Sequence, residues 1–122
     1  MAKGDDLETR LIDFAVRIIE LCDRLPLSSA GNHIGRQLMR SGTSPAPNYA
    51  EARAAESQRD FVHKLKIALK EMNESRIWLK MIVQSELLDA NSIKKTIDEC
   101  EQLCRILSAS IKTSRNRSVK NN

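Results

Sequence analysis

Apolar residues recur at alternating steps of four and three along several long stretches of this 122-residue chain. The clearest stretch runs from about Asp6 to Leu25, with apolar positions at Leu7, Leu11, Phe14, Ile18, Leu21 and Leu25. This spacing places one apolar stripe on one face of an α-helix. Pro26 follows directly, and the residue before a proline avoids helical backbone geometry, so we expect the helix to end there.

Three further helices are expected from capping residues and periodicity. Ser28 or Ser29 can cap a second helix that runs to about Ala55. Ser57, followed three residues later by Asp60, is close to a capping box and opens a third helix to about Glu86.

A turn at residues 89–92 precedes a fourth helix, which we expect to end near Ile111. Four amphipathic helices with short connections predict an all-α fold, an antiparallel up-and-down four-helix bundle. We assign residues 1–111 to a single domain. Residues 112–122 are expected to form a basic C-terminal tail, with Lys112, Arg115, Arg117 and Lys120 as its cations.

Pro45 and Pro47 lie inside the second predicted helix and cannot donate hydrogen bonds to the carbonyls of Ser41 and Thr43. Two outcomes are open. The helix can continue with a bend at Pro45/Pro47, or it can end near Gly42 and restart with Pro45 at its first position. The local sequence slightly favours the restart.

A polar stripe runs through the same segment at steps of four and three: Gln37, Ser41, Ser44, Asn48 and Glu51. One interpretation is a hydrogen-bonded seam that satisfies backbone carbonyls at the proline break and joins neighbouring helices or subunits. The other is the edge of a phosphate-binding surface. Its cations would be Arg36, Arg40 and Arg53, with Lys64, Lys66, Lys70 and Lys80 from the next helix.

The charge distribution supports the second interpretation, a phosphate-binding surface. Residues 33–80 hold nine basic and five acidic side chains, within a chain whose formal net charge is +4. Phosphate contacts gain affinity by releasing counterions from nucleic acid. Because aromatic residues make up only 3% of the chain, contacts to RNA or DNA are expected at the backbone rather than by base stacking.

The polar segment also carries a family resemblance. Gln37-x-x-Arg40-Ser41-x-x-Ser44-x-x-x-Asn48-x-Ala50-Glu51, followed by Asp60-Phe61, Leu65, Ala68 and Glu74, resembles the bacterial 23S rRNA intervening-sequence protein family. The likeness runs from about Phe14 to Ile111. The chain departs from the family pattern at Ala52, where glycine is usual, and at Lys70-Glu71, where a Gly-Ser pair is usual.

The resemblance implies a four-helix bundle and a ring-like homopentamer. It also favours a single second helix bent at Pro45/Pro47, and we adopt the bend over the restart. The resemblance also implies a context, because members look like proteins encoded within insertions in ribosomal RNA genes. Similar bundles act as accessory subunits to reverse transcriptases.

Catalytic, metal and membrane functions are not expected. Cys100 and Cys104 could face a metal with Cys22 or His63, but they lie on the predicted core stripe, where free cysteine behaves as a small hydrophobe. We therefore expect no metal and no cofactor. No nucleophile stands at matching spacing from a base, so no catalytic residue is assigned. The N-terminus lacks a signal-peptide pattern and no apolar run could span a bilayer, which favours a cytoplasmic protein.

We therefore expect a non-enzymatic homo-oligomer that binds structured nucleic acid, RNA or DNA, through a basic surface. Apolar residues beyond a single seam, such as Ile12, Val16 and Ile19, favour oligomerisation. The alternative is a protein-interaction scaffold or accessory subunit with no nucleic-acid role, which would bind its protein partner around Trp78 and Ile106.

Overall fold

The structure, a computed structural model, describes residues 4–121, with side chains as far as residue 117. Its helical segments are α1 (Asp5–Arg24), α2 (Ser29–Thr43), α3 (Pro45–Arg53), α4 (Gln58–Gln84) and α5 (Ala90–Asn121). No strand occurs within residues 4–121. The all-α prediction is confirmed.

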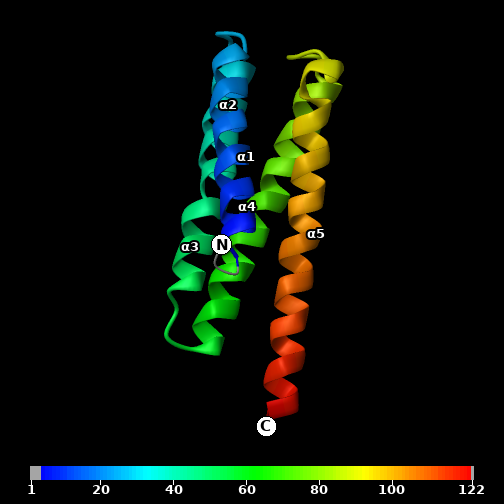
Figure 1. The fold of residues 1–122 in the computed structure, drawn as a ribbon. Coiled ribbons are helices and arrows are strands. Elements are labelled where there is room, and N and C mark those ends of the chain that lie inside the picture. The colour runs from blue at the N-terminus through cyan, green and yellow to red at the C-terminus, as the bar shows by residue number, and fades with distance from the viewer. Residues whose placement is uncertain (1–3, 122) are drawn as a thin grey trace.

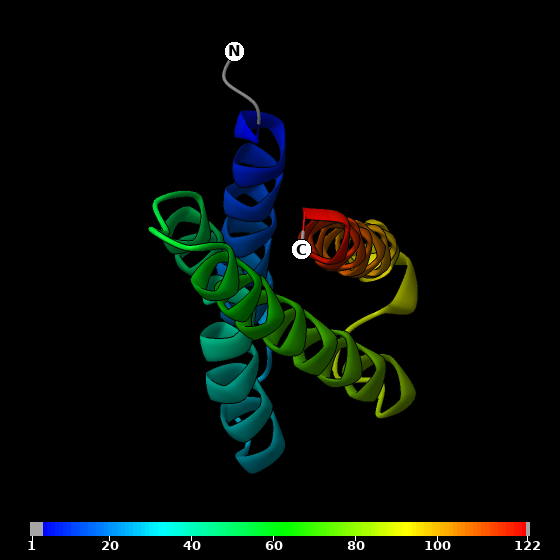
Figure 2. The same ribbon diagram turned by 90° about the horizontal axis from the view of Figure 1, so that it is seen from below.

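The helices form a bundle in which the chain reverses direction at each long connection. It rises through α1, descends through α2 and α3, rises through α4 and descends through α5 (Figure 1). Both α1 and α4 pack against α2, α3 and α5, whereas α1 and α4 lie diagonally across the bundle, with no described Cα atoms of the two within 8 Å. Figure 2 shows α5 nearly end-on while α1 and α4 are seen at length, so the helices cross obliquely.

The second predicted helix is bent at its prolines. It appears as α2 and α3, and Ser44 between them keeps right-handed helical dihedrals, with φ −76° and ψ −37°. The backbone N–H of Asn48 still bonds to the carbonyl of Ser44 at 3.2 Å. Pro45 and Pro47 supply no such donors, which explains a one-residue interruption and a bend without a reversal of the chain.

The predicted caps are confirmed, but the predicted end of the last helix is wrong. The hydroxyl of Ser28 accepts from the N–H of Gly31, and that of Ser57 accepts from the N–H of Asp60, both at 3.0 Å. Helix α5 continues to Asn121 instead of ending at Ile111. The side-chain amide of Gln58 donates to the carbonyl of Ser114 at 3.1 Å, so the start of the expected tail packs against α4.

The core follows the predicted apolar stripes. Its largest fully buried side chains are Phe14, Leu11, Ile18, Leu21, Leu38, Leu65, Met72, Leu79, Ile82, Ile93, Leu103 and Leu107. Leu103 is buried although it lies outside the predicted seam, whereas Cys104, placed on that seam, is half-buried. None of the described helices is both long enough and apolar enough to cross a membrane.

Helix α2 packs closely on α1 because glycines face it. A Cβ at Gly42 would lie 2.8 Å from both Cγ atoms of Ile18, a fully buried side chain. A Cβ at Gly35 would meet only Leu25 Cδ1, at an ordinary 3.4 Å. Gly42 is therefore required by packing, whereas Gly35 is not.

We expect Gly42→Ala to be less stable than Gly35→Ala by about 1 kcal/mol or more. Overpacking a core lowers stability by about 1–3 kcal/mol. The higher helix propensity of alanine raises stability by about 1 kcal/mol at either position. Urea unfolding followed by circular dichroism measures both variants. Equal stabilities would show that α1 and α2 do not approach as closely as the structure places them.

Candidate nucleic-acid interface

Most residues of the polar stripe on the second predicted helix form hydrogen bonds or ion pairs within the bundle. Ser41 is completely buried, and its hydroxyl lies 2.8 Å from the hydroxyl of Ser75 on α4. Ser75 in turn donates to the carbonyl of Glu71 at 3.0 Å. This pair joins α2 to α4 and gives each buried hydroxyl a partner.

The other members of the stripe also have internal roles. The side-chain amide of Asn48 donates to both the carbonyl and the hydroxyl of Ser44, each at 3.0 Å. Glu51 is exposed and pairs with Lys64 of α4 at 3.6 Å. Gln37 is half-buried. The contacts therefore favour a seam between helices over a ligand-binding stripe.

Arg40 is held by two acids of α4. Its guanidinium bonds to Glu71 at 3.1 Å and also to Glu74. Glu74 additionally accepts a hydrogen bond from the indole N–H of Trp78 at 3.1 Å. Arg40 therefore neutralises carboxylates on α4 and adds no free positive charge to the surface.

Arg53 is likewise engaged within the bundle. It bonds to Asp5 at 2.8 Å and to Glu8 at 3.3 Å, joining α3 to the first turn of α1. The hydrogen bond with Asp5 raises the pKa of Arg53. Three predicted phosphate-binding cations, Arg40, Arg53 and Lys64, thus have carboxylate partners in the protein.

The remaining candidates are exposed on α2 and α4. Arg36, Lys66, Lys70 and Lys80 form no ion pair with any other residue that the structure describes. Between residues 61 and 84, every exposed charged side chain is one of the three lysines. We call Lys66, Lys70 and Lys80 the α4 lysine face.

The α4 lysine face is one surface of the helix. Lys66 and Lys70 are about 6 Å apart along the axis, and Lys80 lies about 15 Å further on. The two acids in the same segment are half-buried and turned to Arg40. Exposed Ile77 and Met81 share this surface, so its N-terminal half is cationic and its C-terminal half is largely apolar.

The three free cysteines differ in burial and in the pKa of their thiols. Cys100 is fully buried and its thiol donates to the carbonyl of Met72 at 3.4 Å. Its hydrogen bond with Cys104, together with burial, raises the pKa of Cys100. The same hydrogen bond lowers the pKa of Cys104, against the effect of burial. Burial raises the pKa of Cys22 to about 11. Over residues 4–117, no three His, Cys, Asp or Glu side chains are grouped closely enough to hold a metal ion.

Comparison with known proteins identifies the family. Residues 7–109 match the family described as 23S rRNA-intervening sequence protein. The chain belongs to this family. The resemblance noted from Gln37 to Glu74 is thereby confirmed.

A solved structure of a relative has the same fold as this chain. The relative is a protein of unknown function from the S23 ribosomal protein family of Bacteroides thetaiotaomicron VPI-5482, with 33% sequence identity and a TM-score of 0.82. The similarity covers 87% of this chain and 98% of the relative. No protein with curated annotation matches the chain.

The hydroxyl pair between α2 and α4 is testable by a double-mutant cycle. We expect Ser41→Ala and Ser75→Ala each to lower the free energy of unfolding by about 1 kcal/mol, because each leaves a buried hydroxyl with one partner fewer. The double variant should cost less than the sum, by about 0.5 kcal/mol or more. Urea unfolding of the four proteins measures this coupling. Strictly additive effects would mean that the two hydroxyls do not interact.

Proposed function

We propose that this family member is a non-enzymatic homo-oligomer that binds structured nucleic acid through backbone contacts on the α4 lysine face. The observation that carries the proposal is the separation of charge on α4. Its acids after Asp60 are paired with Arg40, whereas its exposed lysines have no partner among the described residues. Unpaired surface cations are available to phosphates, and each contact releases counterions.

The placement of the aromatic residues favours backbone contacts over base recognition. Phe14 is 1% exposed and Tyr49 is 7% exposed, and Phe61 and Trp78 are half-buried. Stacking on bases requires an accessible ring face. The exposed residues of α4 therefore suit sequence-independent recognition of phosphates.

RNA is the first ligand to test. The family description refers to an intervening sequence of 23S rRNA, and the Bacteroides relative is assigned to a ribosomal protein family. Both names favour RNA over DNA. Geometry alone does not distinguish them, because phosphate contacts are common to both polymers.

We expect Lys66→Gln with Lys70→Gln to weaken binding of a labelled RNA hairpin and to reduce its salt dependence. Each lost phosphate contact lowers the slope of log K against log salt by about 0.9 on a duplex, so the pair should lower it by nearly two. Fluorescence anisotropy between about 50 and about 200 mM salt measures the slope. A matched DNA duplex tests the preference for RNA.

Lys94→Gln with Lys95→Gln is the matched control, because it removes two exposed cations from α5. This control should bind like the wild type. If the control and the α4 variant lose affinity equally, binding depends on net charge and the α4 lysine face has no special role. Absence of salt-sensitive binding by the wild type would reject the proposal.

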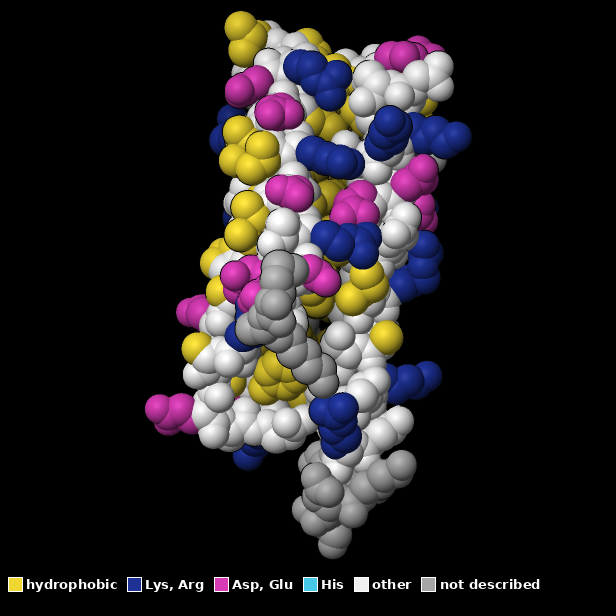
Figure 3. Space-filling view, in the orientation of Figure 1, with side chains coloured by type: hydrophobic (Ala, Val, Ile, Leu, Met, Phe, Trp, Pro, Cys, Tyr) yellow, Lys and Arg dark blue, Asp and Glu magenta, His cyan; other side chains and the backbone are white. Residues whose placement is uncertain are grey.

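The oligomer is supported by apolar side chains that the monomer leaves in contact with solvent. Ile12, Val16 and Ile19 follow one stripe of α1 and are 49%, 45% and 41% exposed. Hydrophobic side chains also gather along the α1 and α2 side of the molecule in Figure 3. Ile77 and Met81 form a second apolar surface on α4.

Because α1 and α4 are diagonal in the bundle, these are two different faces. Contacts between unlike faces generate rings when the rotation closes. This arrangement supports the ring-like pentamer that the family resemblance implies.

We expect Ile12→Glu with Ile19→Glu to dissociate the oligomer, because charges would be buried at the interface without partners. Light scattering coupled to size-exclusion chromatography gives the molecular mass, and circular dichroism checks the helix content. Arg17→Glu, which changes an exposed residue on another side of α1, is the control and should leave the mass unchanged. A monomeric wild type would exclude the ring.

A second candidate function rests on the apolar half of the α4 surface. Ile77 and Met81 are exposed beside half-buried Trp78, whose ring makes an edge contact with His33 at 5.9 Å between centroids. Such a patch could receive a partner protein instead of a neighbouring subunit. Binding that persists at high salt and is lost in Ile77→Glu would favour this function.

A further inference from the structure

Among the described residues, the helices that extend to the lower end of the bundle are α3, α4 and α5. Helix α1 begins at Asp5, whereas α5 continues well past that level (Figure 1). Between α3, α4, α5 and the start of α1 lies a half-open cavity of about 1050 Å³. This volume is slightly above the range for sites that hold small organic molecules, about 300–1,000 Å³.

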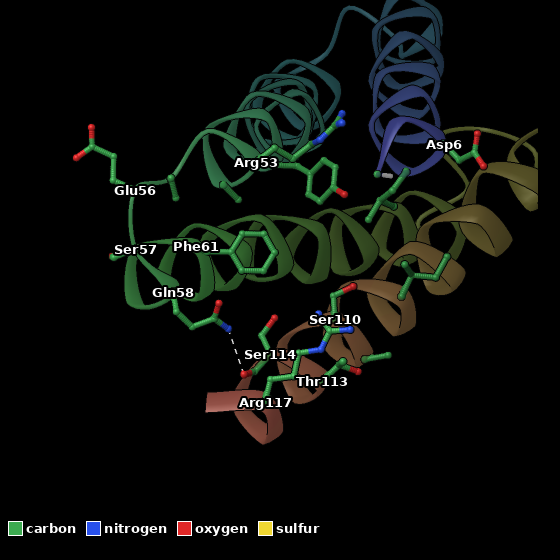
Figure 4. Close-up of a pocket in the computed structure, with 17 residues that line it drawn as sticks. Asp6, Arg53, Glu56, Ser57, Gln58, Phe61, Ser110, Thr113, Ser114 and Arg117 are labelled. Atoms are coloured by element: carbon green, nitrogen blue, oxygen red, sulfur yellow. Dashed lines mark hydrogen bonds between the residues drawn. The ribbon is translucent and has the colours of Figure 1, made fainter. Parts of the chain in front are cut away.

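The cavity has an apolar wall. Leu7, Phe61 and Ile106 line it from three different helices, with Ala52 and Ala109 between them. The ring of Phe61 is directed into the space between α4 and α5 (Figure 4). Helix α1 packs against α3 and α5. Because α1 begins at Asp5, it reaches this wall only with its first turn, through Asp6 and Leu7.

Polar groups without partners also line the cavity. The Tyr49 side chain is 7% exposed, and its hydroxyl, which makes no hydrogen bond to any described residue, reaches solvent at the cavity. On α5, half-buried Ser110 and exposed Thr113 and Arg117 likewise form no side-chain hydrogen bond to a described residue. Burial raises the pKa of Tyr49, so its hydroxyl remains a neutral donor at physiological pH.

The charges at the cavity favour an anion at its α5 end. Figure 4 shows Arg117 running back along α5 beside Ser110 and Thr113. The carboxylate of Glu56 points away from the cavity, and Asp6 lies at the opposite edge. Arg53 is already engaged by Asp5 and Glu8. Arg117 is therefore the cation available to a bound molecule.

We propose that this cavity binds an amphipathic organic anion, with its apolar body against Phe61 and Ile106 and its carboxylate or phosphate head at Arg117. The hydroxyls of Ser110 and Thr113 add donors beside the guanidinium, and Tyr49 offers one more from the facing wall. An apolar pocket with a few convergent polar groups is the usual form of such a site. The site is separate from the α4 lysine face and does not depend on the nucleic-acid proposal.

Isothermal titration calorimetry with dodecanoate on the full chain tests the proposal, at concentrations below those that form micelles. We expect Arg117→Gln to weaken binding about tenfold, the loss of one charge-assisted hydrogen-bonded contact. Arg115→Gln removes an exposed cation from the same helix outside the cavity and should bind like the wild type. Ala109→Trp should fill the cavity and abolish binding, with circular dichroism confirming that the helices are intact.

Two further ligands identify the head group. Dodecanol, which has the same chain without charge, should bind at least tenfold more weakly than dodecanoate. Dodecyl phosphate distinguishes a phosphate-bearing lipid from a free carboxylate, and tighter binding of either anion supports the proposal. Equal binding of dodecanol and dodecanoate, or unchanged binding by folded Arg117→Gln or Ala109→Trp, would overturn it.

Discussion

The contact between α2 and α4 decides which charges of the bundle face solvent. The hydroxyls of Ser41 and Ser75 are buried 2.8 Å apart, and buried polar groups that lose a partner are costly, so this pair fixes how the two helices are aligned. In that alignment Arg40 lies beside Glu71 and Glu74. These are the only acids of α4 after its first turn. Their pairing leaves Lys66, Lys70 and Lys80 as the exposed charged residues of α4 after its first turn.

The bend at Ser44 has a comparable effect at the other end of the bundle. It directs α3 toward the start of α1, where Arg53 binds Asp5 and Glu8. Negative residues in the first turn also suit the positive end of the α1 dipole, so the same acids stabilise the helix start and its contact with α3. The bundle is thus tied together at the level where α1 begins. Below that level the described helices are α3, α4 and α5, and the cavity lies between them and the start of α1.

Local signals in the sequence predicted most of the fold, but not the partners of its charges. The caps at Ser28 and Ser57 depend on residues three positions away, so they could be recognised directly. No proline or glycine after Ile111 marks an end for α5, whereas the contact that its C-terminal part makes, between the carbonyl of Ser114 and Gln58, involves a distant residue that periodicity does not reveal. The partners of Arg40 and Arg53 are more than thirty residues away in sequence. Periodicity shows which face a side chain occupies, but the alignment of two helices decides what it meets.

Three lysines on one helix make only a weak site for a polyanion, because each phosphate contact contributes modestly and is screened by salt. Repetition around a ring would change this balance. Once one subunit holds a nucleic acid, the next contact becomes intramolecular, and its effective concentration depends on the distance between copies of the same face. The cationic and apolar halves of the α4 surface are compatible with such an assembly. A neighbour docked on Ile77 and Met81 would leave Lys66 and Lys70 accessible, since they lie more than one helical turn nearer the N-terminus of α4.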